Sequence, residues 1–478
     1  MKRRQFLRVT SGVIASSGVA SLNLSFGKNK STLETLRVAA VGFGGRGKAL
    51  ISAANASKNA KVVALADADE KILNNPLKDD STIIRETDFR RLLDRKDIDV
   101  IISATPNHWH ALLTVFACQA GKHVYIEKPI SHNMFESRAV VAAADRYKKM
   151  VQCGFQNRSD TGVFPFFDRL NAGEFGKVTS VHGTCHRGRN SIGKTEKALK
   201  VPNHINYEMW LGPAADQPIY RPRLHYDWHW DFNTGNGDVG NQGPHEWDLM
   251  NWALGDSAQL PSSIKACGNR FGWNDAGNTP NVMAVSGVMN KVPFFFEVMD
   301  LRPGVKPPHG RGVGVIVETE KGRFVGGRGG GTFTHKDGKK EAFKRTAGRD
   351  GTNDHMQNFF DAVLTDDRSK LKSDCKVAAK SSSMAHMANI SYQMGESCQA
   401  TELHGRFAKT DAEKELIERL IQAPEIYHKK HGETATDWVA GPALSFDNGS
   451  SKFSGALADA ANQKMSRDYR TDFQFPNG

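Results

Sequence analysis

The 478-residue sequence contains few cysteines, and none of them form a close pair. A CxxC pair or a dense cysteine framework is lacking, which excludes a small domain stapled by disulfides. We therefore expect mostly buried thiols. The six positions are Cys118, Cys153, Cys185, Cys267, Cys375 and Cys398.

The sequence also lacks an apolar run of the roughly 20 residues that a stable membrane span needs. It has no HExxH or cysteine-histidine spacing, so no metal site is predicted. The formal net charge is +12, but Lys and Arg are interspersed with acidic residues along the chain and form no long basic run. Nucleic-acid binding is therefore not predicted, and the charge favours solubility with a mild attraction to anions.

The N-terminus has the order of features expected of an export signal. Residues 2–8 read KRRQFLR, and a weakly apolar run rich in Gly, Ala and Ser follows over 9–24. This pattern predicts a twin-arginine signal peptide and linker over residues 1–30, export through the Tat translocon and a periplasmic location. A disordered basic start of a cytosolic protein is the alternative. Gly18-Val19-Ala20 is a candidate cleavage site.

The length suits two domains, and the first is predicted over residues 36–155. Short apolar runs with β-branched residues recur in this part, separated by stretches long enough for a crossover helix. This alternation predicts an α/β fold with a parallel, doubly wound sheet, the Rossmann architecture. The predicted strands are 36–41, 62–66, 100–104 and 123–126.

Longer strand-like segments with Gly-rich loops predict an α+β domain over 156–405, with strands at 178–184, 282–289 and 293–299 and helices at 354–363 and 378–394. We expect an open, largely antiparallel sheet. An uncovered apolar face would need a partner, so a homodimer or homotetramer formed through that face is predicted. Residues 406–478 form a polar C-terminal extension with one helix-like piece at 411–421.

A glycine motif follows the first predicted strand and precedes a helix. It consists of Gly42, Phe43, Gly44, Gly45, Arg46 and Gly47, which fit GxGxxG in the context that a dinucleotide site requires. Asp67 closes the second strand, where a carboxylate accepts hydrogen bonds from ribose hydroxyls and repels a 2′-phosphate. NAD is therefore favoured over NADP. Arg46 argues against this preference for NAD, because an arginine in this loop can bind a 2′-phosphate. The alternative is that Arg46 lies over the adenine.

Three further motifs resemble those of the Gfo/Idh/MocA family of oxidoreductases, which includes glucose-fructose oxidoreductase and inositol dehydrogenase. They are Thr105-Pro106-Asn107-His108-Trp109-His110, Glu127-Lys128-Pro129 and the GNQGPHEWD stretch over 240–248. The resemblance spans about residues 36–400. It implies that Lys128 and His245 line the site beside the nicotinamide. The family's aspartate position is Asn241 here, which questions any mechanism in which a carboxylate orients the histidine.

Oxidation of an alcohol requires residues of the same types. An alcohol hardly ionises at neutral pH, so a positioned base such as His245 is needed to accept its proton. Lys128 can donate to the same oxygen and stabilise the developing alkoxide. Lys128, His245 and Asn241 are therefore the predicted catalytic residues.

Other residues are assigned to the cofactor or to the substrate. The predicted cofactor contacts beyond the glycine motif and Asp67 are Thr105, Asn107, His110, Glu127, Lys128, Gln156 and Asn157. An aromatic cluster over 225–231 suits a sugar, which offers C–H surfaces and hydroxyls. The predicted substrate residues are Arg158, Tyr226, Trp228, Asp238 and His245.

Three functions remain open from the sequence. The first is an oxidoreductase that acts on a sugar or polyol and holds its nicotinamide cofactor tightly. The second is a glycoside hydrolase that uses NAD transiently, through oxidation at C3 of the sugar and elimination. The third is a non-catalytic sugar-binding protein, since a fold alone does not determine function.

Overall fold

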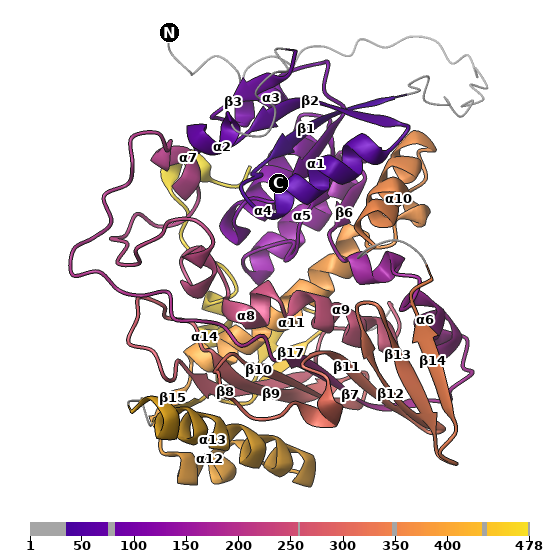
Figure 1. Cartoon of the computed structure of the whole chain (residues 1–478), viewed down its shortest axis with the longest axis vertical. Coiled ribbons are helices and arrows are strands. Elements are labelled where there is room, and N and C mark those ends of the chain that lie inside the picture. Colours follow the sequence, from indigo (N-terminus) through magenta and orange to yellow (C-terminus); the bar gives the residue numbers. More distant parts are fainter. Residues whose placement is uncertain (1–34, 75–81, 257–258, 347–350, 433–436, 477–478) are drawn as a thin grey trace, which may run out of the picture.

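The computed structural model describes residues 35–74, 82–256, 259–346, 351–432 and 437–476. The predicted export signal and its cleavage site lie outside these residues. Figure 1 shows two layers of structure, with a parallel sheet and its helices above a second, larger sheet.

The first domain is the predicted Rossmann fold. Its six strands are all parallel and lie in the order β3-β2-β1-β4-β5-β6. The short strands β3 and β6 fall outside the four predicted segments. The strands are β1 (Leu36–Val41), β2 (Ala60–Ala66), β3 (Ile84–Glu86), β4 (Val100–Ser103), β5 (His123–Ile126) and β6 (Val151–Cys153). The helices are α1 (Arg46–Ala56), α2 (Glu70–Leu73), α3 (Arg90–Leu93), α4 (Asn107–Gln119) and α5 (Met134–Arg146).

The second domain is built on a 12-stranded sheet in the order β14-β13-β12-β11-β7-β10-β9-β8-β16-β15, with β17 beside β8 and β18 beside β17. Only β10 and β7 pair in parallel, so the prediction of a largely antiparallel sheet is confirmed. The strands are β7 (Val178–Cys185), β8 (Ser263–Asn269), β9 (Val282–Met289), β10 (Val292–Met299), β11 (Val313–Thr319), β12 (Gly322–Gly327), β13 (Gly330–His335), β14 (Lys340–Lys344), β15 (Glu396–Cys398), β16 (Trp438–Ala440), β17 (Leu444–Asp447) and β18 (Lys452–Ser454).

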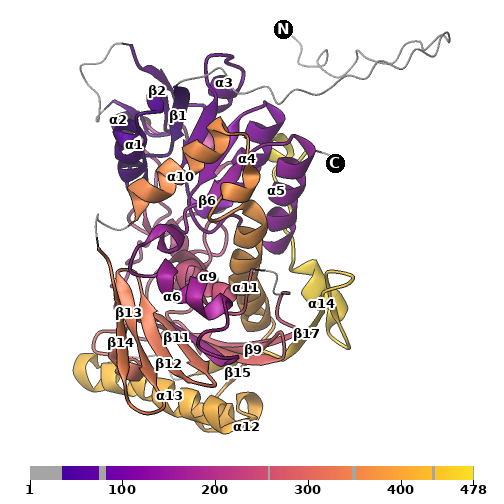
Figure 2. The ribbon, with the colours of Figure 1, turned by 90° about the vertical axis from the view of Figure 1, so that its right-hand side faces the viewer.

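Helices cover both faces of this sheet. The helices of this part are α6 (Phe164–Asn171), α7 (Tyr207–Leu211), α8 (Gly237–Asn241), α9 (Pro244–Ala253), α10 (Thr352–Leu364), α11 (Cys375–Gln393), α12 (Ala400–Phe407), α13 (Asp411–His431) and α14 (Ala458–Gln463). In Figure 2, α9 and α11 lie on the face toward the Rossmann domain, and α12 and α13 lie on the opposite face.

The two domains share helices that the sequence assigned to the second domain alone. Helix α10 packs on α1, and Met356, Phe359 and Phe360 join the same buried cluster as the strands of the Rossmann sheet. Helix α11 begins in the Rossmann core at Cys375 and ends in the core of the second domain at Tyr392. The chain therefore returns to the first domain, which ties the two halves together.

The outer face of the second-domain sheet is not the uncovered apolar face from which an oligomer was predicted. The apolar part of the outer sheet face is covered by the chain's own α12 and α13, because Leu403, Leu416 and Leu420 pack on Val282 and Ala284 of β9. The remaining outer positions of β7, β11 and β12 are mostly polar. An oligomer therefore stays a prediction without this support.

The C-terminal residues are part of the fold. Helix α13 begins with a capping box between Thr410 and Glu413 and ends at Gly432, so it is longer than the predicted 411–421. Strands β16 and β17 then extend the second sheet at β8. All six cysteines lie in the described part of the chain, and all are buried and unpaired, as the sequence predicted. None of the described helices is long and apolar enough to cross a membrane.

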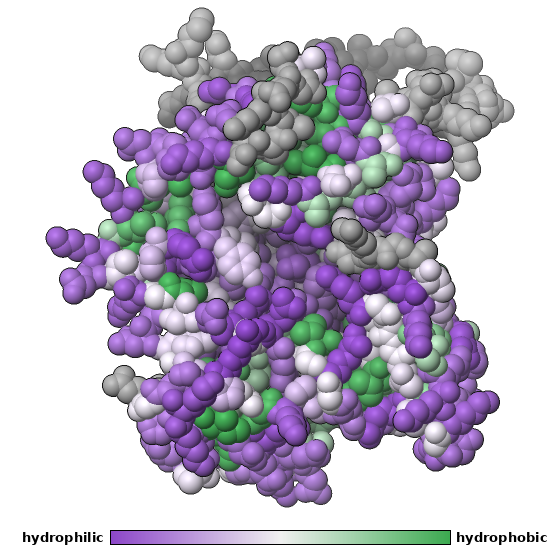
Figure 3. Space-filling view, in the orientation of Figure 1, coloured by the Kyte–Doolittle hydropathy of each residue, from purple (hydrophilic) through white to green (hydrophobic). Residues whose placement is uncertain are grey.

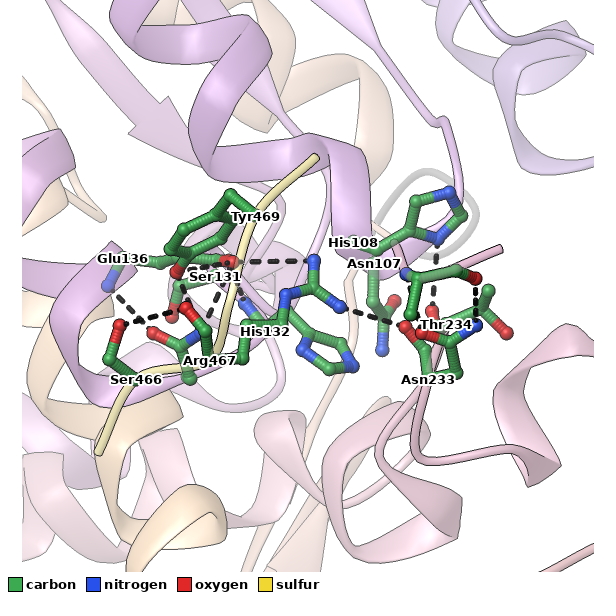
Figure 4. Close-up of polar contacts among 12 residues, drawn as sticks. Asn107, His108, Ser131, His132, Glu136, Asn233, Thr234, Ser466, Arg467 and Tyr469 are labelled. Atoms are coloured by element: carbon green, nitrogen blue, oxygen red, sulfur yellow. Dashed lines mark hydrogen bonds and ion pairs between the residues drawn. The ribbon is translucent and has the colours of Figure 1, made fainter. Parts of the chain in front are cut away.

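The last residues return to the Rossmann domain and insert Arg467 into a buried polar network (Figure 4). Arg467 donates to the carbonyl of Asn233 at 2.8 Å and lies 3.5 Å from the Glu136 carboxylate. Tyr469 donates to the same carboxylate, which is fully buried. Arg467 therefore links α5, the residues before α8 and the C-terminus.

We expect the substitution Arg467→Met to lower the free energy of unfolding by about 2 kcal/mol, because it removes a charged partner from a buried carboxylate. Urea unfolding measures the change. Lys464→Met, on an exposed position of the same tail, is the matched control and should change stability by less than about 0.5 kcal/mol. Equal stability of the two variants would contradict this role for Arg467.

Candidate functional site

A cavity of about 600 Å³ lies at the carboxyl edge of the Rossmann sheet, where that edge faces the second domain. Its lining includes residues that end β1 and β2 and residues that follow β5, together with residues of α8, α9 and the β12–β13 turn. Figure 3 shows this face of the molecule hollowed between its two halves. Ligands of open α/β sheets bind at this edge, and the volume is in the range of cofactor and substrate sites.

Most of the residues predicted from the sequence line this one cavity. They are Gly42, Gly44, Gly45, Arg46, Asp67, Thr105, Asn107, His110, Glu127, Lys128, Gln156, Tyr226, Trp228, Asn241 and His245. Five predicted residues are not among the lining residues, namely Phe43, Gly47, Asn157, Arg158 and Asp238.

The glycine loop turns tightly between β1 and α1. Gly42 has φ of +72°, and a Cβ there would come within 2.9 Å of the Thr105 backbone. A Cβ on Gly47 would lie 2.3 Å from the Gly42 carbonyl oxygen. Gly47 therefore serves close packing of α1 on the loop, and lies outside the cavity for that reason. No side chain caps the N-terminus of α1, so its backbone N–H groups are available to a phosphate.

Asp67 lies at the end of β2 with its carboxylate held in place. The backbone N–H groups of Phe43 and Asp69 each donate to it at 3.0 Å. Burial raises the pKa of Asp67, and these two hydrogen bonds oppose the rise. Arg46 donates to Glu127 at 2.9 Å and to Thr352 at 2.8 Å. Thus Phe43 acts through its backbone, and the side chain of Arg46 is engaged by Glu127.

The turn after β4 is held by its own polar residues. Both ring nitrogens of His110 lie against backbone carbonyls, those of Pro129 and Thr105. Asn107 donates to Asn236 at 3.2 Å, and so connects α4 to the second domain. His110 and Asn107 therefore shape the cavity wall with polar atoms that are already engaged.

Lys128 reaches from the Rossmann domain to the second domain. Its Nζ donates to the carbonyl oxygen of Asn241 at 2.7 Å. Burial lowers the pKa of Lys128, and the carboxylates of Glu127 and Asp238 oppose the drop. Glu127 itself accepts from Gln156 at 2.8 Å. The ammonium group is thus fixed at the domain boundary with protons left to donate.

His245 lies at the start of α9 and is buried. Its Nε2 is 3.5 Å from Nη2 of Arg328, and its Nδ1 has no hydrogen-bond partner among the described residues. Burial lowers the pKa of His245 well below its ordinary value, and the charges of Arg328 and Lys128 lower it further. The ring is therefore neutral at pH 7, which is the state a proton acceptor needs.

The side chain of Asn241 does not contact His245 in this structure. Its amide donates to Asp238 at 3.1 Å, and its backbone carbonyl accepts from Lys128. The structure therefore shows no contact through which residue 241 would orient the histidine, and the predicted catalytic role of Asn241 stays a prediction. Asn241 positions Lys128 through its main chain, because the turn of α8 aims that carbonyl at the ammonium group.

Two predicted substrate residues are engaged in buried ion pairs. Arg158 is bonded to Asp248 at 2.8 Å and to Asp256 at 2.8 Å, and its guanidinium lies over the Trp252 ring. Arg158 is only 4% exposed and does not line the cavity, so a role in substrate binding stays a prediction. Asp238 is fully buried beneath Arg189, and Asn157 is 2% exposed outside the cavity lining.

Three arginines of the second domain line the cavity but were not singled out from the sequence, namely Arg187, Arg189 and Arg328. Gln242 also lines the cavity and lies within the 240–248 motif, although it was not predicted as a site residue. Arg187 and Arg189 follow β7, and Arg328 lies in a glycine-rich turn far from His245 in sequence. Arg189 donates to Asp238 at 2.7 Å and to the Tyr226 hydroxyl at 2.8 Å.

Residues 186–236, here called the covering segment, cross from the second domain to the Rossmann domain and back (Figure 1). Within it, Met209 and Trp210 of α7 line the cavity near Asp67. The Asn206 N–H donates to the Ala68 carbonyl at 2.7 Å, and His225 lies 2.9 Å from Asp69. The segment therefore covers the end of the cavity where the adenosine of a dinucleotide would lie.

We expect the acid limb of the pH–rate profile to lie below the ordinary imidazole range, because a lowered pKa keeps His245 unprotonated to lower pH. Arg328→Gln should move that limb upward, since it removes a positive charge beside the ring. Profiles of kcat/KM against pH measure both. An unchanged limb in the variant would show that Arg328 and His245 do not interact.

No group of three His, Cys, Asp or Glu side chains is placed to hold a metal ion in the described part of the chain.

Two family models match the chain. Residues 36–155 match the NAD-binding Rossmann fold of the Gfo/Idh/MocA oxidoreductase family, and residues 178–279 match its C-terminal alpha/beta domain. The matches agree with NAD as the predicted cofactor and with the two domains in the predicted order.

Known relatives share part of this chain. An inositol 2-dehydrogenase of Salmonella paratyphi B is 33% identical over 119 residues, 25% of this chain and 34% of that protein. A glycosyl hydrolase family 109 protein of Shewanella pealeana is 28% identical over 126 residues, 24% of this chain and 28% of that protein. The chain thus matches about a third of the length of these relatives.

A solved structure has the same fold over most of its length. The WlbA dehydrogenase of Bordetella pertussis, crystallised with NADH and UDP-GlcNAcA, aligns with a TM-score of 0.54 at 18% identity. The alignment covers 74% of this chain and 94% of that one.

Proposed function

We propose that this chain is an NAD-dependent enzyme that oxidises a hydroxyl group of a sugar or polyol, because two models of the Gfo/Idh/MocA oxidoreductase family match it. One observation carries the proposal. A single cavity has a phosphate-binding loop and Asp67 at one end, and Lys128 and the neutral ring of His245 at the other.

The residues present fit a dinucleotide. The uncapped start of α1 faces the cavity, and the space beside Gly45 is open, which leaves room for a pyrophosphate. The Asp67 carboxylate is placed for ribose hydroxyls, and Met209 and Trp210 cover that end. When NAD is bound, it accepts a hydride from the carbon that is oxidised.

The chain's own residues handle the oxygen and the proton. Lys128 donates a hydrogen bond to the substrate oxygen, which stabilises the negative charge that develops there. His245 is uncharged, so it accepts the hydroxyl proton. Asn241 holds Lys128 at the boundary, and the covering segment limits the access of water. Tyr226 and Trp228 supply flat surfaces for the C–H face of a sugar.

The proposal includes export and a retained cofactor. Residues 1–30 have the pattern of a twin-arginine signal, which serves export of folded proteins. Outside the cytoplasm no nicotinamide pool exists to exchange with, so the cofactor must stay bound. The contacts of Asn206 and His225 with the Rossmann domain support slow release. A second substrate, or a redox-neutral reaction, must then restore the oxidised cofactor.

A second candidate is an NAD-dependent glycoside hydrolase that oxidises C3 of the sugar, eliminates the aglycone and returns the hydride after water addition. The likeness to a glycosyl hydrolase family 109 protein favours keeping it. It uses the same first step, with Lys128 and His245 in the same roles. The two candidates differ only in what happens after that step.

One experiment separates these functions. The protein is purified without added cofactor, denatured, and its NAD(H) content is measured, with about one per chain expected. The folded protein is then incubated with free sugars and aryl glycosides, and ketosugar and released aglycone are measured separately. Ketosugar supports the oxidoreductase, and aglycone without net oxidation supports the hydrolase. An empty protein that needs millimolar NAD contradicts the retained cofactor.

A further inference from the structure

The second-domain end of the cavity carries an excess of positive charge. Three arginines of that domain line it, Arg187, Arg189 and Arg328. Arg189 is neutralised by the buried carboxylate of Asp238 at 2.7 Å. Arg187 and Arg328 are exposed, and neither has a carboxylate within ion-pair distance among the residues that the structure describes.

The neighbouring acidic and basic groups do not remove this excess. Glu246 is the carboxyl group whose field reaches Arg328, but burial raises its pKa to about 8, so it is protonated at neutral pH. Glu127 is engaged by Arg46. Asp67 lies at the adenosine end. Arg187 and Arg328 thus line this end of the cavity without a carboxylate partner, and Arg328 lies beside His245.

We propose that the substrate is an anionic sugar, whose carboxylate, sulfate or phosphate group is bound by Arg187 and Arg328. The inference rests on the proposed function and specifies its substrate class. Guanidinium groups present planar pairs of donors that match the oxygens of such anions. A neutral sugar would offer neither guanidinium group an opposite charge.

The position of Arg328 also connects binding of the anionic group to proton transfer at His245. Its Nη2 is 3.5 Å from Nε2 of His245, so the neutral ring presents a lone pair to the guanidinium. An anion that binds Arg328 competes for the same N–H donors and leaves Nε2 free for the hydroxyl proton. Binding of the correct substrate thereby prepares the proton acceptor.

The test compares sugars that differ only in charge. Glucose is paired with glucuronate, glucose 6-sulfate and glucose 6-phosphate, and galactose is paired with galacturonate. We expect kcat/KM to be about 10- to 100-fold higher for at least one anionic member, the range for hydrogen bonds to charged groups. Which anion gives the largest preference identifies the group that the site accepts.

Three variants test whether Arg187 and Arg328 cause the preference for an anionic sugar. Arg328→Gln and Arg187→Gln should each lower it by about tenfold or more, mainly through a higher KM for the anionic sugar. Lys339→Gln removes the same charge from the exposed turn between β13 and β14, and should keep the preference. Circular dichroism checks that each variant is folded.

Two results would overturn the inference. Equal kcat/KM for charged and neutral sugars would show that the arginines do not select an anion. Loss of bound NAD(H) from the arginine variants, with the preference intact, would assign them to the cofactor phosphates. Calorimetric titration of the same pairs tests the charge preference even if no sugar is oxidised, so failure of the proposed function is distinguishable.

Discussion

We expect His245→Ala to lower kcat by about 10²- to 10⁴-fold, the range for loss of a general acid–base group. The variant should keep its bound cofactor, because the glycine loop and Asp67 are untouched. Steady-state kinetics and the NAD(H) released on denaturation measure the two effects.

The matched control for this prediction is His428→Ala, on an exposed position of α13 far from the cavity lining. It should keep wild-type kcat and cofactor content. Activity of His245→Ala within a few-fold of wild type would contradict the role of the ring as proton acceptor. Loss of cofactor together with activity would point to a role in binding.

Arg158→Met is expected to lower the free energy of unfolding by about 3–5 kcal/mol, because it leaves the carboxylate of Asp248 buried without its cation. Asp248 is fully buried, whereas the side chain of Asp256 is 44% exposed, so most of the loss comes from the former. The variant Arg158→Met with Asp248→Leu should recover part of the stability. Denaturant unfolding measures both.

Arg406→Met is the control for this prediction, since it breaks exposed pairs with Glu396 and Glu402. It should cost less than about 1 kcal/mol. If Arg158→Met were as stable as this control but showed a raised KM, Arg158 would bind substrate after all, as the sequence had suggested.

The first domain was largely predictable because its signals are local. Strands β1, β4 and β5 follow from short apolar runs, and the loop at Gly42 follows from glycines directly after a strand. Lys128 and His245 were found through motifs that resemble a known family. The structure places both in one cavity, although their roles stay predictions until variants are measured.

The parts that sequence reasoning missed depend on contacts between distant residues. Arg158 follows β6 as a site residue would, yet its partners come from α9 and the loop after it. Arg328 is separated from His245 by 83 positions, and nothing in a glycine-rich turn indicates that they meet. The sequence predicted part of the amphipathic helix α13. It did not indicate that α13 covers the sheet face that was expected to be open.

The most direct test of the account follows a hydride from the sugar to the cofactor. The purified protein is mixed with a sugar whose carbon-bound hydrogens are replaced by deuterium, the mixture is quenched within a turnover, and the released nicotinamide cofactor is analysed by mass spectrometry. The account predicts reduced cofactor that carries one deuterium in the wild type, and none in His245→Ala. Sugar turnover or tight sugar binding with no deuterium in the cofactor would contradict it.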